Sequence, residues 1–269
     1  MRNPFRNPLA PALEVWQHRY LLGQLVHRDV LLRYRGAMFG AAWMFLSPLF
    51  MLLVFAYVFG QIFQARWMHT GDTLPFWLLL YAGLIPFNLF AETVSRAPAA
   101  VRSYPSYVKK IVFPVQVLPV VPLGAALVHG AFNLALLVAA LAITGHLHAG
   151  MLLFPLALLP ALLLAVGMAW FISAWGVFIK DMSQIVPMLL QVLMFISPVF
   201  YPIDAVPAAL RPLYLLNPLG PVIEACRHLV AGQAVPWASW AAALVVCWLA
   251  ALLGYAFFRH SREEFADAL

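Results

Sequence analysis

The sequence predicts an all-α integral membrane protein with six membrane-spanning helices, and three observations carry that prediction. Of the 269 residues, 64% are hydrophobic and only 10% are charged, which gives a soluble globule of this size too little polar surface to stay dispersed. Residues 36–65 contain no Asp, Glu, Lys or Arg, whereas about 20 apolar helical residues cross a bilayer core roughly 30 Å thick. Basic residues, among them Arg28, Arg33 and Arg35, lie beside such runs. A helical membrane protein accounts for all three observations.

Charge-free intervals and turn residues give the spans in chain order. They cover about residues 38–63, 73–95, 115–142, 151–178, 186–201 and 237–258. The third and fourth spans share an uncharged interval, residues 111–179, which the polar stretch 144–148 divides. Pro86 is expected to kink the second span, a break that neighbouring helices accommodate. Residues 202–236 carry six prolines and are expected to form a long segment that does not span.

The positions of Lys and Arg predict the orientation, because positive charges are enriched on the cytoplasmic side of membrane proteins. With the N-terminus inside, 13 of the 16 Lys and Arg residues fall on cytoplasmic segments. Only Arg66, Arg211 and Arg227 fall outside. Both termini are therefore expected to be cytoplasmic.

The sequence lacks the motifs of an ATPase or a hydrolase. None of the three lysines follows a glycine, so none is the lysine of a phosphate-binding loop. No Gly-x-Ser-x-Gly or His-Glu-x-x-His pattern occurs, and the ten carboxylates are expected at or beyond the ends of the spans. Cys226 and Cys247 have no metal-ligand spacing. We expect no catalytic residue, metal site or cofactor in this chain, and no nucleic-acid partner, since anionic lipid explains the basic residues better.

Two polar groups accompany apolar segments. His129 is expected at mid-span depth, where a histidine is more often a packed hydrogen-bonding residue than a proton relay. Glu224 with Arg227 and His228 is expected to form a local ion pair on one helical turn. A secondary transporter is an alternative class, but it would be expected to show inverted repeats, broken helices and acids near the midplane, and none of these is found. A membrane-embedded glycan-modifying enzyme would need convergent carboxylates or histidines.

Several short patterns are spread over nearly the whole chain. They are Arg28-Asp29 with Arg33-Tyr34-Arg35-Gly36, then residues 107–114 with Leu118-Pro119, then residues 195–202 with Asn217-Pro218, and finally Phe265-Ala266-Asp267. In this order they resemble the membrane subunits of ABC exporters that move lipid-linked polysaccharides, such as the permeases for O-antigen, capsule and teichoic acid. Lys180-Asp181 departs from the resemblance, since the family often has Arg-Asp there.

The resemblance implies a single permease domain over residues 1–269, with an amphipathic interface helix at about 12–26 and an outer re-entrant helical segment at 202–236. It implies that two such subunits form a pore in a bacterial inner membrane. It also implies that ATP and Mg are bound by a separate cytoplasmic ATPase subunit. We therefore expect export of O-antigen-like lipid-linked polysaccharide. An ABC permease for drugs or simple lipids is the alternative within the same fold.

The candidate site residues fall into three groups. Arginine binds phosphate through a planar fork of donors, so a pyrophosphate headgroup is expected to contact Arg28, Arg33, Tyr34 and Arg35. The alternative for these residues is that they anchor the first span and bind ordinary anionic lipids. By the resemblance, coupling to the ATPase involves Arg102, Tyr107, Lys109, Lys110, Lys180 and Asp181. Aromatic faces offer stacking surfaces to sugars, so the candidates for a glycan channel are Phe39, Tyr57, Phe59, Phe87 and Phe90.

Overall fold

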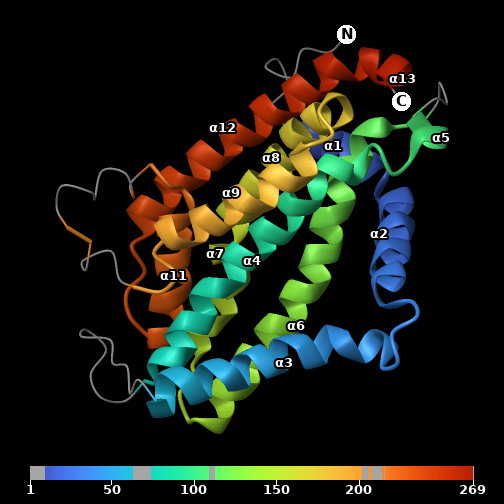
Figure 1. Cartoon of the computed structure of the whole chain (residues 1–269). Coiled ribbons are helices and arrows are strands. Elements are labelled where there is room, and N and C mark those ends of the chain that lie inside the picture. The colour runs from blue at the N-terminus through green and yellow to red at the C-terminus, as the bar shows by residue number, and fades with distance from the viewer. Residues whose placement is uncertain are drawn as a thin grey trace.

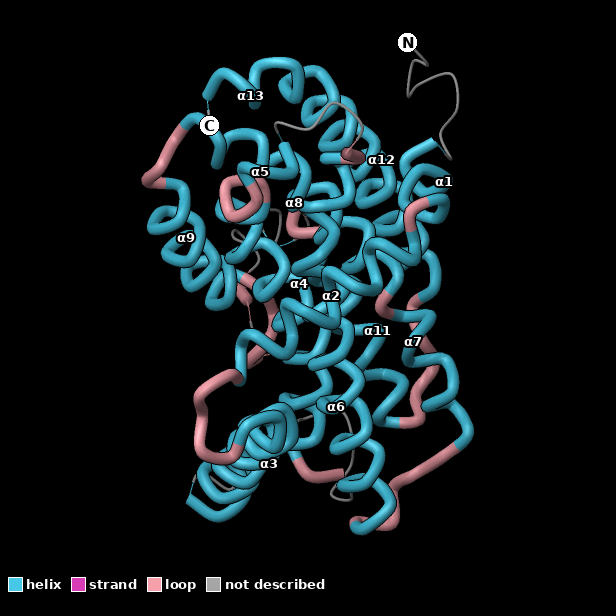
Figure 2. Tube along the Cα trace, turned by 90° about the vertical axis from the view of Figure 1, so that its right-hand side faces the viewer, coloured by secondary structure: helices cyan, strands magenta, loops and turns pink. Residues whose placement is uncertain are grey.

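A computed structural model of the chain describes residues 10–62, 74–108, 113–201, 206–207, 214 and 216–268. In these residues the chain is helical and contains no strand, which confirms the predicted class (Figures 1 and 2). The helices in chain order are α1 (Ala10–Gln17), α2 (Arg19–Tyr34), α3 (Trp43–Phe55), α4 (Phe76–Ala100), α5 (Pro105–Val108), α6 (Val121–Ile143), α7 (Phe154–Ala157), α8 (Leu159–Phe178), α9 (Met182–Ile196), α11 (Leu219–Ala231), α12 (Trp237–Ser261) and α13 (Phe265–Ala268).

Within the described residues, five helical segments are long and apolar enough to cross a membrane. They are Gly40–Ile62, Phe76–Ala100, Val115–Ile143, Ala149–Phe178 and Trp237–Glu264. These correspond to the first, second, third, fourth and sixth predicted spans. Short 3₁₀- or π-helical segments extend the α-helices of four of these spans, such as the π-helical segment Ala56–Ile62 after α3.

The fifth predicted span, residues 186–201, is not a full span in the structure. It is α9, an apolar helix of 15 residues, whereas about 20 residues are needed to cross the hydrocarbon core. The helix stops at Ser197, whose backbone is extended (φ −79°, ψ 146°) because Pro198 disfavours a helical residue before it. The predicted count of six spans is therefore not confirmed, and the boundary of the fifth was set too late.

The helix α4 lies at the centre of the subunit. It packs against α6, α8, α9 and α11. In its most apolar stretch of 18 residues 78% is buried, whereas only 6% is buried in the corresponding stretch of the span Gly40–Ile62. In Figure 1 the helices α4, α8, α9 and α12 lie roughly along one axis, and α3 lies across the lower ends of α4 and α6. Most of α3 thus faces away from the core of its own subunit.

Two close helix contacts depend on glycine. A Cβ on Gly254 of α12 would lie 2.1 Å from the carbonyl oxygen of Gly167 on α8. A Cβ on Gly176 would lie 2.3 Å from the carbonyl oxygen of Pro98 on α4. Small residues allow the backbones of membrane helices to approach this closely. The two contacts fix α8 between α12 and α4.

The N-terminal segment forms two helices where one interface helix was predicted. The chain turns at His18 between α1 and α2, and α2 continues eight residues beyond the predicted end at residue 26. Side chains tie both helices to the rest of the subunit. Glu14 of α1 accepts hydrogen bonds from the Tyr255 hydroxyl and from Gln116 Nε2, the latter at 3.2 Å. Asp29 of α2 pairs with Arg96 of α4 at 2.6 Å.

The predicted outer segment, residues 202–236, is described only in part. Its main described element is α11, which packs on α4 and ends at Gly232 with a left-handed backbone (φ 66°). Arg227 of α11 is 3% exposed and donates to Glu224 Oε1 at 2.8 Å, to the Leu79 carbonyl at 3.4 Å and to the Val199 carbonyl. The predicted ion pair is thereby confirmed. The re-entrant course of the segment stays a prediction.

Candidate functional site

A pocket lies where α2 turns into the first span. Its volume is about 440 Å³, and it is lined by Arg28, Leu31, Leu32, Tyr34, Arg35, Ala41 and Met44. Gly36 and Gly40, both with positive φ (87° and 48°), allow the chain to turn sharply between α2 and α3, which lie at a steep angle to each other in Figure 1. Three of the four residues predicted to receive a headgroup therefore share one cavity.

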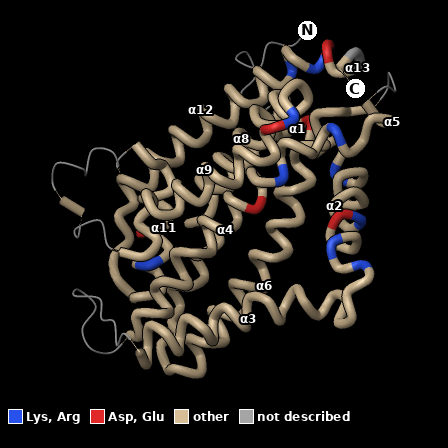
Figure 3. The backbone as a smooth tube through the Cα atoms, viewed as in Figure 1, with Lys and Arg blue, Asp and Glu red and all other residues tan. Residues whose placement is uncertain are grey.

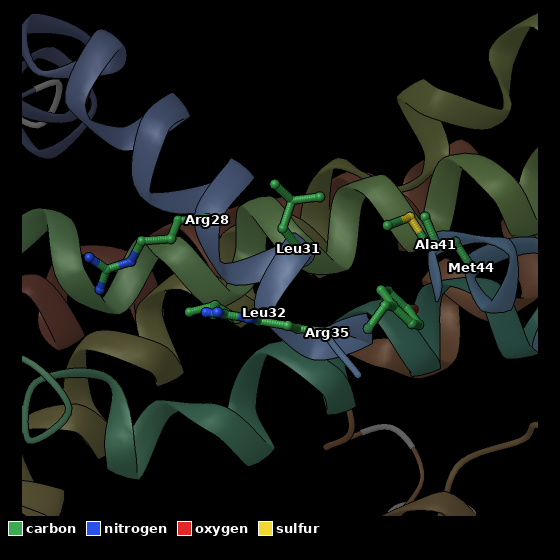
Figure 4. A pocket seen from close by; sticks show the side chains of 7 residues that line it. Arg28, Leu31, Leu32, Arg35, Ala41 and Met44 are labelled. Atoms are coloured by element: carbon green, nitrogen blue, oxygen red, sulfur yellow. The ribbon is translucent and has the colours of Figure 1, made fainter. Parts of the chain in front are cut away.

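The pocket is polar at one end and apolar at the other. In Figure 4, Arg28 lies at one end, and Ala41 and Met44 lie at the opposite end. Leu31 and Leu32 complete the apolar lining. Arg35 is exposed; its backbone N–H donates to the Leu32 carbonyl, and its side chain forms no ion pair with the residues that the structure describes. Such a pocket suits a ligand that joins an anionic group to a hydrocarbon chain.

Arg28 also contacts the loop that follows α4. Its guanidinium carbon lies 5.1 Å from the centre of the Tyr104 ring, within the range of a cation–π interaction. A hydrogen bond to Tyr104, with a weaker contribution from Tyr107, raises the pKa of Arg28. The side chain is therefore positively charged at any physiological pH, and it joins the pocket to this loop.

Arg33 is not among the residues that line the pocket. It points to α4 and α6, where it forms an ion pair with Glu92 and its Nη1 lies 2.8 Å from His129 Nδ1. His129 Nδ1 is also 2.7 Å from Glu92 Oε1, and its Nε2 is 2.9 Å from the Tyr34 hydroxyl. The structure thus separates Arg33 from Arg28 and Arg35, with Tyr34 between the two groups.

The expectation that all carboxylates lie at or beyond the ends of spans is wrong for Glu92. The helix α4 runs to Ala100 and not to residue 95, so Glu92 lies eight residues inside it. The prediction that His129 is a packed hydrogen-bonding residue is confirmed, but its partners were missed. A sequence signal was present: Glu92 and His129 are almost equally distant from Lys110, in the middle of the loop that joins these two spans. When two adjacent helices are antiparallel, residues that are equally distant from the connecting loop lie at the same depth in the membrane.

The loops predicted to couple to an ATPase meet at one end of the subunit. Arg102, just after α4, donates from Nη2 to Ser183 Oγ at 3.0 Å, which joins the α4–α5 loop to the start of α9. Lys180 and Asp181 are exposed beside this bond. Tyr107 stacks on Phe113 with ring centres 4.8 Å apart. Lys109 and Lys110 lie outside the described residues.

Charged residues gather at the same end. Among the described residues, Figure 3 shows Lys, Arg, Asp and Glu mainly along α2 and near α1, α5 and α13, and few toward the opposite end. Figures 1 and 2 both place α5 and α13 at this end. Phe265 of α13 packs on Phe258 and Phe178, with ring centres 5.3 Å and 6.0 Å apart. The C-terminal helix is thus fixed beside the α8–α9 loop.

The five aromatic channel candidates occupy three kinds of environment. Phe39 and Tyr57 are 56% and 63% exposed. Phe59 is half-buried, and its ring centre lies 6.1 Å from that of Phe55 and 5.6 Å from that of Phe76. Phe87 and Phe90 lie in the core of the subunit. In this conformation only Phe39 and Tyr57 offer open ring surfaces to a ligand.

Within the described residues, no group of three or more His, Cys, Asp and Glu side chains is arranged to hold a metal ion. Three functional features lie within the described residues: an amphipathic pocket, a partly buried polar cluster beside it, and a polar surface formed by two loops.

Comparison with known proteins gives a consistent result over almost the whole chain. Residues 20–231 match a family described as ABC-2 type transporter. The chain is 29% identical to the O-antigen export system permease protein RfbA of Myxococcus xanthus, over 95% of this chain and 98% of the relative. It is 21% identical to a protein of the same name from Klebsiella pneumoniae, over 93% and 95% of the two chains. It is 28% identical to the polysialic acid transport protein KpsM of Escherichia coli, over 76% and 78%.

Proposed function

The chain belongs to the ABC-2 type transporter family, and on this premise we propose that it is the membrane subunit of an ABC exporter of lipid-linked polysaccharide. The names of its relatives support the substrate class, since two are O-antigen export permeases and one transports polysialic acid. The chain is not itself an ATPase. ATP and Mg are bound by a separate cytoplasmic subunit, and two copies of this chain form the pore.

The observation that carries the proposal is the amphipathic pocket at the start of the first span. A polyprenyl pyrophosphate has a compact anionic headgroup joined to a long hydrocarbon chain. Arg28 and Arg35 would bind the headgroup through charge-assisted hydrogen bonds, and Leu31, Leu32 and Met44 would contact the first part of the hydrocarbon chain. Arg33 would take part only after it leaves Glu92.

The ATPase would dock on the surface formed by the α4–α5 loop and the α8–α9 loop. The Arg102–Ser183 hydrogen bond makes these two loops one surface, so a movement of the ATPase would reach α4 and α9 together. Exposed Lys180 and Asp181 add charges of both signs at its edge. Lys109 and Lys110 are proposed to extend this surface. The contact between Arg28 and Tyr104 would pass the movement to the pocket.

This arrangement also supports an orientation. Because the charged end would meet a cytoplasmic ATPase, we place α1, α5 and α13 on the cytoplasmic side of a bacterial inner membrane, with both termini inside. The single permease domain would comprise the five full spans and α9, and α11 would belong to an outer re-entrant segment. Anionic lipids would contact the basic residues of α2 at the inner surface. The glycan would pass exposed rings such as Phe39 and Tyr57.

Two other functions make different demands on the molecule. A permease for drugs would need no strong phosphate-binding group, whereas this pocket holds two arginines; a permease for simple lipids would transport a substrate without a glycan. A secondary transporter would use the intramembrane pair Glu92–His129 for ion coupling, without an ATPase. Such a carrier would move substrate when produced alone, but an ABC permease would not.

Co-production tests the proposal directly. The permease, tagged at its C-terminus, should co-purify with an ABC ATPase of the same export system, and cells that lack the permease should retain lipid-linked glycan on the cytoplasmic face. Charge-reversing substitutions at Lys180 and Asp181 provide a surface control that should weaken co-purification while the permease stays folded. Normal export from cells that lack the ATPase would contradict the proposal.

A further inference from the structure

A polar cluster joins α2 to two of the membrane-spanning helices next to the headgroup pocket. It consists of Arg33 of α2, Glu92 of α4 and His129 of α6. Glu92 is eight residues from the end of α4 and His129 is eight residues from the start of α6, so each lies about 12 Å inside its helix. A carboxylate at this depth needs a partner, because charges inside a membrane are costly and are almost always paired. Arg33 provides that partner.

The His129 ring offers Glu92 a second partner. Its Nδ1 lies 2.7 Å from Glu92 Oε1 and 2.8 Å from Arg33 Nη1. A neutral ring nitrogen either donates or accepts, so Nδ1 serves the carboxylate or the guanidinium, but not both at once. The Tyr34 hydroxyl, 2.9 Å from Nε2, donates or accepts to match either tautomer. Glu92 would therefore keep a hydrogen-bond donor if Arg33 left it.

Tyr34 connects this cluster to the pocket. The side chain that bonds to His129 also lines the cavity, together with Arg28 and Arg35. Arg33 stands between Leu32 and Tyr34 in the sequence, and both of these line the pocket. Its side chain is 41% exposed, whereas that of Glu92 is 19% exposed. The guanidinium is thus the accessible and flexible member of its ion pair.

We propose that Glu92 is a positioning residue that holds Arg33 until a phosphate-bearing lipid headgroup binds in the pocket, and that the phosphate then takes Arg33 from Glu92. This inference rests on the proposed function and adds a residue that sets the affinity for the headgroup. One anion replaces another on Arg33, and the His129 Nδ1–H donates a hydrogen bond to the Glu92 carboxylate, so Arg33 keeps an anionic partner and Glu92 keeps a hydrogen-bond donor. The helix α2 then keeps only its Asp29–Arg96 ion pair to α4.

The test is a binding titration of the full-length protein in zwitterionic detergent micelles with polyprenyl diphosphate as the probe. Glu92→Gln removes the competing anion and should tighten binding about two- to fivefold, the range expected for a partly exposed ion pair. Arg33→Gln should weaken binding by a similar factor. In the double variant, Glu92→Gln should have no further effect, because its partner is already gone.

Asp29→Asn is the matched control. It removes the same unit of negative charge, next to Arg28 in the sequence, and it also breaks an ion pair between α2 and α4. Binding to this variant should match the wild type. Equal tightening by Asp29→Asn and Glu92→Gln would overturn the proposal, because net charge alone would then explain the effect. Unchanged or weaker binding by Glu92→Gln would overturn it as well.

Two further arms separate the remaining explanations. Inorganic pyrophosphate should bind far more weakly than the lipid, because it does not contact Leu31, Leu32 or Met44. Equal affinity would contradict a role of these residues in binding the hydrocarbon chain and would indicate a site for the phosphate group alone. If Glu92→Gln does not give monodisperse protein, Glu92→Asp is used in the same titration. The shorter Asp side chain holds its carboxylate further from Arg33, so this variant should tighten binding by a smaller factor. If the wild-type protein binds no polyprenyl diphosphate, the proposed headgroup site itself is contradicted. If binding depends on the arginines but is unchanged by substitution of Glu92, only this inference is contradicted.

Discussion

The contact between α8 and α12 should tolerate no side chain at Gly254. A Cβ there would lie 2.1 Å from the Gly167 carbonyl oxygen and 3.1 Å from the Gly167 Cα. Because these are backbone atoms, Gly254→Ala must move the helices apart by about 1 Å. Overpacking of this kind costs about 1–3 kcal/mol. A change of 1 kcal/mol shifts the melting temperature of proteins with 150–250 residues by roughly 2–4 °C, so the variant should melt roughly 2–12 °C below the wild type.

The assay is thermal unfolding of the purified protein in detergent, followed by the loss of monodisperse material. Gly23→Ala is the control, because a Cβ on Gly23 in the helix α2 meets no atom within 4 Å. Alanine favours a helix over glycine by about 0.5–1 kcal/mol, so this variant should melt at or slightly above the wild-type temperature. Equal melting of Gly254→Ala and the wild type would refute the close contact. The contact has a functional consequence, since α8 leads into the α8–α9 loop and α12 into α13.

Three further predictions follow from the described contacts. Arg102→Ala and Ser183→Ala should each lower ATP-driven export, because each removes the same 3.0 Å hydrogen bond. The double variant should export no less than either single variant, and additive losses would show that the two residues have separate roles. Arg227→Met should destabilise the permease by about 3–5 kcal/mol in thermal unfolding, because the Glu224 carboxylate and the Leu79 and Val199 carbonyls lose the donor that Arg227 provides. An unchanged melting curve would contradict this. Glu14→Gln should weaken the bond from Tyr255 by about 1 kcal/mol and speed hydrogen exchange across α1, so unaltered protection there would argue against this attachment.

The membrane spans could be predicted because hydrophobic length is a local property of the sequence. Five of the six predicted intervals coincide with candidate spans among the described residues. The fifth was placed too late because Pro198 was counted within it, although the residue before a proline disfavours the helix. The division of the N-terminal segment at His18 has no clear signal in its weak amphipathic pattern.

The sequence predicted which residues belong to the candidate headgroup site, but not how their side chains are arranged relative to one another. Arg28 lies in α2 and Arg35 directly follows its last residue, two helical turns further along the chain, so both reach the same pocket. Arg33 is five residues from Arg28 and faces another way. Its partners Glu92 and His129 come from two other helices, so only their equal distance from the connecting loop could have brought them together. The burial of Phe87 and Phe90 likewise depends on packing between helices, and the positions of aromatic residues in the sequence do not reveal that packing.

The ATPase rate of the reconstituted complex tests the central claim most directly, because the claim is that this permease recognises a lipid-linked glycan by its phosphate headgroup. The permease and its ATPase are placed in nanodiscs of zwitterionic lipid, and hydrolysis is measured with and without a polyprenyl-diphosphate-linked glycan. The account predicts stimulation of the wild-type complex and loss of that stimulation in a variant with Arg28→Gln and Arg35→Gln that still binds the ATPase. Equal stimulation of both complexes, or none in the wild type, would contradict it.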